Sequence, residues 1–300
     1  MNRLIGMTLI AISAASFGTL AIFGRYADIN GIDTYTLLFL RFGVSAILIG
    51  ALLIFRREGF PRGKTLFQLI GMGAIGYVGQ SFSYLTAIRY ASAGLVALLL
   101  YLYPVYVALL SSLVYHEKIT RVKALALGLA LTGTALTVSP EGGQLPGILL
   151  ALSAALIYSF YIIVGTHVMQ KVSAVQSSTV IFASAGLVYG VLTATHGPHF
   201  PTTLAGWWVI VGIVIVATVI PVITFLAGLQ RIGPINASML STLEPVVTVI
   251  LAALLFQESL KPITLLGGGL ILIAVIILTR SEFRKDSQTP FNPYTPEMPV

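Results

Sequence analysis

The sequence contains no cysteine and very little charge, and both features narrow what the chain can be. Without cysteine, disulfides, thiol catalysis and cysteine-ligated metals are excluded. Charged residues make up 9% of the 300 residues, against about 25% in soluble globular domains. Hydrophobic residues make up 57%, and the mean hydropathy is +0.95. A chain with so little charge cannot cover itself in water, so a lipid bilayer must be part of its solvent.

Long apolar runs with short connections between them occupy most of the chain. A bilayer core of about 30 Å offers no hydrogen-bond partners to the backbone, so each run should be a membrane-spanning helix. The first run follows Met1-Asn2-Arg3 as a signal peptide would, but it stays apolar through Phe23, which predicts a retained helix. The fold class is therefore an all-α integral membrane protein of ten transmembrane helices. The predicted spans are residues 4–25, 34–55, 66–88, 92–115, 122–139, 146–166, 177–195, 204–229, 236–257 and 262–280.

The distribution of lysine and arginine predicts how the chain is oriented. If the N-terminus is cytoplasmic, the segments on that side hold 13 of the 17 basic residues. The other side holds Arg25, Arg89 and Lys261, and Arg41 lies within the second span. Both termini are therefore predicted to be cytoplasmic. The net charge of +7 reflects this topology and does not indicate a nucleic-acid partner. Residues 281–300 hold four prolines and are predicted to be a disordered cytoplasmic tail.

An internal repeat divides the chain into two halves. One constant shift of the sequence against itself, which places Gly6 on Gly147, aligns matching residues along most of the chain. The halves are residues 1–140 and 146–280, each with five predicted spans. Because five is odd, the second half must enter the membrane from the opposite side, which predicts inverted repeats with a shared site near the midplane. Such symmetry is typical of carriers that alternate access. Further matching pairs are Phe17 and Tyr158, Pro104 and Pro245, and Glu117 and Glu258.

Two stretches carry a resemblance to a known family. Residues 102–110 (LYPVYVALL) and 243–251 (LEPVVTVIL), each running on to a glutamate, resemble the signature of EamA-type repeats. Leu40-Arg41-Phe42 in the second span does so too. The chain is thus identified as a member of the drug/metabolite transporter superfamily over roughly residues 4–280. The resemblance implies a bacterial inner-membrane exporter of small metabolites, commonly amino acids and including aromatic ones. An integral membrane enzyme is a less favoured alternative, because the predicted spans hold no deep histidine, no paired acids and no nucleophile with its base. No cofactor is expected.

Two charged side chains lie within predicted spans, where charge is costly and usually functional. Glu244 is positioned to hold a substrate ammonium or to take up a proton, or it stabilises backbone freed by Pro245. Arg41 offers a bidentate partner to a substrate carboxylate. A structural role is favoured for Arg41, in which it extends to the outer surface or pairs with Asp33 or Asp28.

Polar and aromatic residues on several spans are predicted to line a cavity for an apolar or aromatic side chain. One stripe recurs at helical spacing in the third span. In the fourth span Tyr103 and Tyr106 are expected to face the cavity, with Tyr101 turned elsewhere. The ninth span offers a polar face of Ser238, Ser241, Pro245 and Thr248. The alternative is a set of interfacial aromatic belts. The predicted substrate-binding residues are Tyr77, Gln80, Ser81, Tyr84, Tyr103, Tyr158, Tyr161, Ser241 and Glu244.

Other motifs receive structural interpretations or remain open. Pro104 and Pro245 are either gating hinges or static kinks. The glycines of Gly71-Met-Gly-Ala-Ile-Gly76 match a dinucleotide motif but lie inside a span, which favours helix packing. The first span lacks the acidic residue that small multidrug exporters use there, although drugs or nucleosides remain alternative substrates. The expected partners are a small-molecule substrate and the lipid bilayer, with no metal and no nucleic acid.

Overall fold

A computed structural model describes residues 2–91, 93–137, 144–257 and 261–288, and the predicted spans are helical in these ranges. The α-helices are α1 (Asn2–Gly18), α2 (Leu20–Ile29), α3 (Thr34–Phe55), α4 (Gly63–Gly71), α5 (Val78–Ala87), α6 (Ala93–Leu100), α7 (Tyr103–Tyr115), α8 (Arg121–Thr137), α9 (Leu145–Val168), α10 (Ala174–His196), α11 (Leu204–Val214), α12 (Ile220–Leu240), α13 (Glu244–Phe256) and α14 (Pro262–Gln288). Two π-helices, η1 (Met72–Tyr77) and η2 (Ile215–Val219), and one 3-10 helix, η3 (Ser241–Leu243), join some of them.

The fourteen α-helices in the described part of the chain account for the ten predicted spans, since several spans consist of two helical pieces joined end to end. Among the described residues, seven helical segments are long and apolar enough to cross a membrane. One of them, Leu204–Phe256, has 53 residues, about twice the length that a span requires. Gly233 breaks this segment with a φ of 76°, so it supplies two spans. The stretch α4–η1–α5 and the helix α8 supply the remaining two.

The two halves interrupt their helices at equivalent positions. The helices α7 and α13 begin at Tyr103 and Glu244, which are counterparts in the internal repeat, and each has a proline in its first turn. The residues that follow them, His116 and Gln257, are also counterparts, and both are left-handed with φ of 54° and 56°. The π-helices η1 and η2 also fall in the equivalent third and eighth spans. The backbone therefore repeats as two inverted five-helix units, as the internal sequence match predicts.

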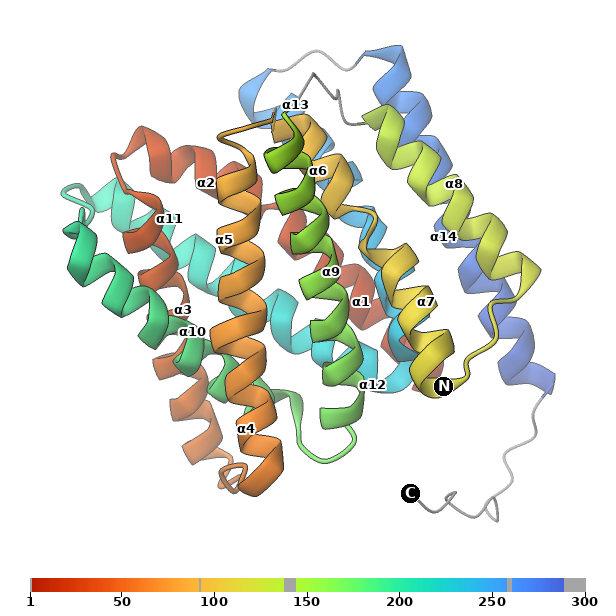
Figure 1. The fold of residues 1–300 in the computed structure, drawn as a ribbon, viewed down its shortest axis with the longest axis horizontal. Helices are drawn as coiled ribbons and strands as arrows, with labels where there is room; N and C mark the ends of the chain where they lie inside the picture. The colour runs from red at the N-terminus through yellow and green to blue at the C-terminus, as the bar shows by residue number, and fades with distance from the viewer. Residues whose placement is uncertain (1, 92, 138–143, 258–260, 289–300) are drawn as a thin grey trace.

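The repeats pack closely along equivalent helices (Figure 1). The helix α3 lies along α10, and α8 lies along α14 at one edge of the bundle. Each pair joins corresponding spans of the two repeats, the second with the seventh and the fifth with the tenth. The helix α1 packs along α12, and α5 packs along α9. The repeats therefore interleave, and a site between them can draw side chains from both.

Small residues allow the third span to approach its neighbour, as the glycine motif predicts. Gly73 belongs to η1, so the motif is helical and forms no phosphate-binding loop. A Cβ atom on Gly73 would overlap Ser184 Oγ and the Ile181 carbonyl oxygen of α10. Only a residue without a side chain allows this contact, which fixes η1 against the second repeat.

The last helix is longer than the sequence predicts. The helix α14 continues past Arg280 to Gln288, into the segment expected to be a disordered tail. The four prolines on which that expectation depends begin only at Pro290, so nothing in residues 281–288 forces the helix to end. The rest of the predicted tail, residues 289–300, lies outside the described residues.

Candidate functional site

A cavity of about 610 Å³ lies between the two repeats. Its walls come from spans 1 to 4 of the first repeat and from α9, α11 and α13 of the second. In α3 the lining residues are Thr34, Leu37, Leu38 and Arg41, which belong to the first turns of that helix. The cavity therefore reaches from the middle of the bundle to the helix ends on the face opposite the termini.

Seven of the nine predicted substrate-binding residues meet in this cavity, and two of them do not. Ser241 is buried outside the lining, where its hydroxyl donates to the Ala237 carbonyl at 2.9 Å. Tyr161 lies behind Tyr77, with ring centroids 5.3 Å apart. The predicted residues that do line the cavity are Tyr77, Gln80, Ser81, Tyr84, Tyr103, Tyr158 and Glu244, together with Pro245.

Breaks in two helices explain where the predicted faces are wrong. Tyr101 lines the cavity and Tyr106 does not, because the chain leaves the α-helix between α6 and α7, just before Tyr103. In the ninth span, η3 separates Ser238 from Thr248, which does line the cavity. A helical wheel assumes one unbroken α-helix, so it misplaces residues on either side of such a break.

The first span contributes a wall that the site prediction does not include. Phe17, Leu20, Ala21 and Gly24 line the cavity from α1 and α2. The internal repeat held a signal for this wall, because Phe17 is the counterpart of Tyr158 in the second repeat.

Arg41 is 6% exposed and is anchored to the second repeat. Its Nε donates to Thr218 Oγ1 at 2.8 Å, and its Nη2 donates to the Ala217 carbonyl at 3.3 Å. Both acceptors belong to η2. Neither suggested carboxylate partner is used, since Asp33 instead caps α3 by accepting from the backbone N–H groups of Tyr35 and Thr36. Arg41 nevertheless borders the cavity.

Glu244 opens α13 at the middle of the bundle and borders the same cavity. Its position in the first turn places the carboxylate at the positive end of the helix dipole. Within the described residues, the Glu244 carboxylate has no hydrogen-bond or ion-pair partner in the structure. The side chain is half-buried, so a ligand in the cavity can reach it.

The two charges occupy positions that are not equivalent in the two repeats. Under the shift that relates the repeats, the counterpart of Arg41 is Phe182, and the counterpart of Glu244 is Tyr103. The first repeat therefore supplies the cation and the second supplies the anion. The cavity offers opposite charges from opposite repeats, in a wall otherwise rich in tyrosine.

Asp33 lies at the end of α3 beside the mouth of the cavity. Its carboxylate accepts from the His199 backbone N–H at 3.3 Å as well as from the first turn of α3. Burial raises the pKa of Asp33, but the hydrogen bonds from Thr36, Tyr35 and His199 outweigh that effect and leave the pKa below its usual value. The stabilising contribution of this cap is therefore present above the usual pKa and is lost as the pH falls through the lowered value.

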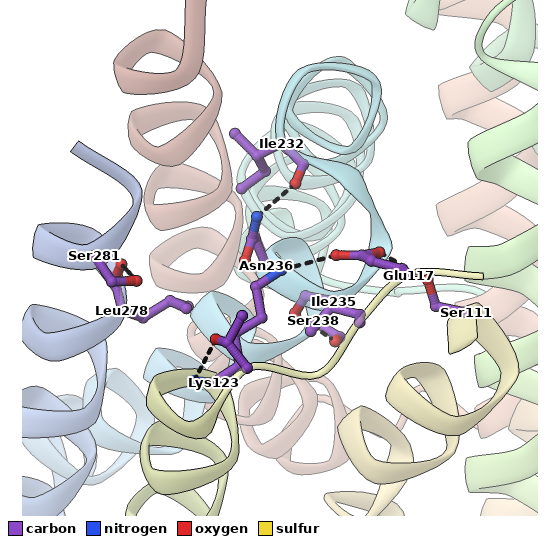
Figure 2. Close-up of polar contacts among 10 residues, drawn as sticks. Ser111, Glu117, Lys123, Ile232, Ile235, Asn236, Ser238, Leu278 and Ser281 are labelled. Atoms are coloured by element: carbon purple, nitrogen blue, oxygen red, sulfur yellow. Dashed lines mark hydrogen bonds and ion pairs between the residues drawn. The ribbon is translucent and has the colours of Figure 1, made fainter. Parts of the chain in front are cut away.

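Polar contacts join neighbouring helices on the side of the termini, and some of them are drawn in Figure 2. The Tyr103 hydroxyl donates to the Ser238 carbonyl at 3.2 Å, which joins α7 to α12 below the cavity. Nearer that face, Lys123 Nζ lies 2.7 Å from Glu117 Oε1, beside Asn236 of α12. The Ser111 hydroxyl donates to Glu117 Oε2 at 2.8 Å. Of these contacts, the one between Tyr103 and Ser238 crosses between the repeats. The residues that line the cavity lie between the middle of the bundle and the face opposite the termini, so the cavity opens on that opposite face.

Comparisons with known proteins agree with this architecture. The profile of the EamA-like transporter family matches residues 4–139 and again residues 145–280. An uncharacterized transporter of Archaeoglobus fulgidus is 30% identical, over 92% of this chain and 96% of its own. The uncharacterized inner membrane transporter YedA of Escherichia coli is 23% identical, over 81% of this chain and 80% of its own.

A solved crystal structure shares the fold. It superposes with a TM-score of 0.81 at 20% identity, over 93% of this chain and 98% of its own. The family matches, the transporter relatives and the ten-helix architecture identify a multi-pass membrane protein that acts as a secondary transporter and not as an enzyme. This chain belongs to the EamA-like transporter family, and it carries both repeats of that family.

Proposed function

We propose that this transporter carries amino acids, including aromatic ones, and exports them from the cytoplasm. The observation that supports this proposal is that Arg41 and Glu244 border one cavity. A zwitterion presents a carboxylate and an ammonium together, and each finds a partner of opposite charge here. Charged groups are costly within a membrane, which favours a functional reason for retaining both.

The rest of the cavity suits an apolar or aromatic side chain. Its volume of about 610 Å³ falls within the usual range of small-molecule sites, about 300–1,000 Å³. Tyr77, Tyr84, Tyr101 and Phe17 supply ring surfaces, and Gln80 supplies an amide group. Aromatic rings pack against a bound ring with little loss of conformational freedom, so this wall favours large side chains over small ones.

Inverted repeats support transport by alternating access. In the present state Tyr103 of the first repeat contacts Ser238 of the second on the terminal side. In the internal repeat, Tyr103 corresponds to Glu244 and Ser238 corresponds to Ala97. Both of these counterparts line the open cavity. The opposite state would therefore close α6 onto α13 and release α7 from α12, which opens the cavity towards the termini.

The predicted orientation assigns the faces. With 13 of the 17 basic residues on the side of the termini, that side is the cytoplasm of a bacterial cell. The present cavity then faces outwards, in the state that releases an exported substrate. Loading takes place in the opposite state.

A second candidate is the export of organic cations such as drugs. Glu244 among several tyrosine rings would also bind an amine, through charge attraction and cation–π contacts. Arg41 disfavours it, because a cation lacking a carboxylate leaves this charge unpaired. The two candidates thus differ in whether the ligand must carry a carboxylate.

Uptake into proteoliposomes tests the proposal. The purified chain would be assayed with radiolabelled L-phenylalanine, L-leucine, a nucleoside and a quaternary-ammonium drug, with and without a pH gradient. We expect uptake of the amino acids above that of protein-free vesicles, and stimulation by the gradient if protons are coupled. Uptake of the drug alone would contradict the proposal and favour the second candidate. Absence of amino-acid uptake under both conditions would also overturn it.

A further inference from the structure

We infer that Thr218 and Pro221 are positioning residues, which hold the Arg41 guanidinium in the orientation that receives a substrate carboxylate. This inference rests on the amino-acid function proposed above and assigns the specificity for the carboxylate to residues outside the cavity lining. Neither Thr218 nor Pro221 borders the cavity, and both are buried in the eighth span.

The Thr218 hydroxyl donates to a backbone carbonyl of α11, and this contact leaves its oxygen to act as an acceptor. It donates to the Ile213 carbonyl at 2.8 Å, five residues earlier, which is the spacing of a π-helix. With the proton committed to Ile213, the oxygen can only accept from Arg41 Nε, 2.8 Å away. Thr218 has no exposed surface, so water cannot compete for this hydrogen bond.

The second acceptor depends on a proline. In a regular α-helix the carbonyl of Ala217 would accept from the N–H four residues later, but that residue is Pro221, which has no N–H. Arg41 Nη2 donates to this carbonyl at 3.3 Å. The proline therefore makes an acceptor available at the position that the guanidinium reaches.

Together the two acceptors leave one edge of the guanidinium for a ligand. Nε and Nη2 share one edge, and η2 occupies it. The other edge, formed by Nη1 and the second hydrogen of Nη2, has no hydrogen-bond acceptor among the described residues. A buried arginine with a purely structural role is expected to satisfy its donors within the protein. Two parallel N–H donors match the geometry of a carboxylate, and Arg41 borders the cavity where a carboxylate would lie.

Binding to pairs of ligands with and without a carboxylate tests the inference. Competition against radiolabelled L-phenylalanine would be measured with purified protein in nanodiscs, with L-phenylalanine and L-phenylalaninamide as competitors. Thr218→Val keeps the shape but removes the acceptor, and we expect it to weaken L-phenylalanine binding about tenfold. The amide lacks the carboxylate, so its affinity should change less than about twofold. Thr218→Ser keeps the hydroxyl acceptor and should bind L-phenylalanine as the wild type does. Pro221→Ala returns an N–H to the helix and should weaken L-phenylalanine binding as Thr218→Val does.

Thr224→Val is the matched control, because the Thr224 hydroxyl donates only within its own helix, to the Ile220 and Pro221 carbonyls. It should leave both affinities unchanged. Equal weakening of the acid and the amide by Thr218→Val and Pro221→Ala would indicate a general packing defect and overturn the inference, as would unchanged binding of the acid. Either result leaves the proposed function intact. Failure of the wild-type protein to bind L-phenylalanine would instead contradict the proposed function, and the inference with it.

Discussion

The two charges of the cavity are held in different ways. Arg41 is tied to Thr218 and Ala217 of the other repeat, which fixes its orientation. Glu244 lies in the first turn of α13, and its carboxylate has no hydrogen-bond partner within the described part of the chain. A fixed guanidinium and an unpaired carboxylate suit a ligand that brings the missing ammonium with it. Under our proposal, the binding energy at Glu244 therefore comes largely from the substrate.

Replacing Glu244 should affect ligands according to their charge. With Glu244→Gln we expect L-phenylalanine binding to weaken at least about tenfold, because a charge-assisted hydrogen bond contributes about 1.5–3 kcal/mol. Competition by 3-phenylpropionate, which has no ammonium, should not weaken. The assay is the nanodisc competition described above. Normal transport by Glu244→Gln at all pH values would show that this carboxylate is structural.

The sequence predicted which residues border the cavity better than it predicted the contacts that each of them makes. Glu244 stands out because an acid inside an apolar run is rare, and it does border the cavity. Arg41 stands out equally, but its anchors lie 176 and 177 residues away along the chain. They also depend on a π-helix, which hydrophobic periodicity does not predict. The sequence therefore favoured local carboxylate partners for Arg41 that the structure does not use.

The breaks between helical pieces decide which residues face the cavity, and the regular helices decide only where the spans lie. The second span, residues 34–55, was predicted with the bounds that α3 has, because a long apolar run specifies a membrane helix well. The faces around Tyr101 and Ser241 were predicted wrongly, since both lie at breaks between helical pieces. Sequence spacing locates a face only while the helix type stays the same.

The close contact of η1 with α10 gives a test at the same scale. Gly73→Ala should lower the free energy of unfolding by about 1–3 kcal/mol, because the new methyl group would overlap the Ile181 backbone carbonyl. It should also reduce uptake, since η1 carries Tyr77 into the cavity. The matched control is Gly71→Ala, because a Cβ there has no atom within 4 Å. Thermal unfolding in detergent would compare the stability of the two variants, and the proteoliposome assay would compare their uptake. Equal stability of the two variants would contradict tight packing at η1.

For the whole molecule, the inverted repeat was the most informative feature of the sequence. One constant shift, kept along most of the chain, predicted two five-helix units and a site between them. The equivalent breaks before Pro104 and Pro245 confirm that the backbone repeats, while leaving their role in gating as a prediction. The sequence could not indicate which face is closed, because an inverted repeat can close on either side of the site. That choice appears only in the contacts that the structure makes, such as that of Tyr103 with Ser238.

Because the chain has no native cysteine, substrate binding in this one-sided cavity can be measured by labelling a single introduced thiol. A single Ala97→Cys variant would carry the only thiol of the chain, on the wall of the cavity. Its labelling by a membrane-impermeant maleimide would be followed from each side of the membrane, with and without L-phenylalanine. Thr195→Cys is the control, since Thr195 is exposed near the same face and does not line the cavity.

We predict that Ala97→Cys is labelled faster from the face opposite the termini, and that L-phenylalanine slows this labelling but not that of Thr195→Cys. Faster labelling from the side of the termini, or labelling that L-phenylalanine does not change, would show that this cavity is not an outward-facing substrate site.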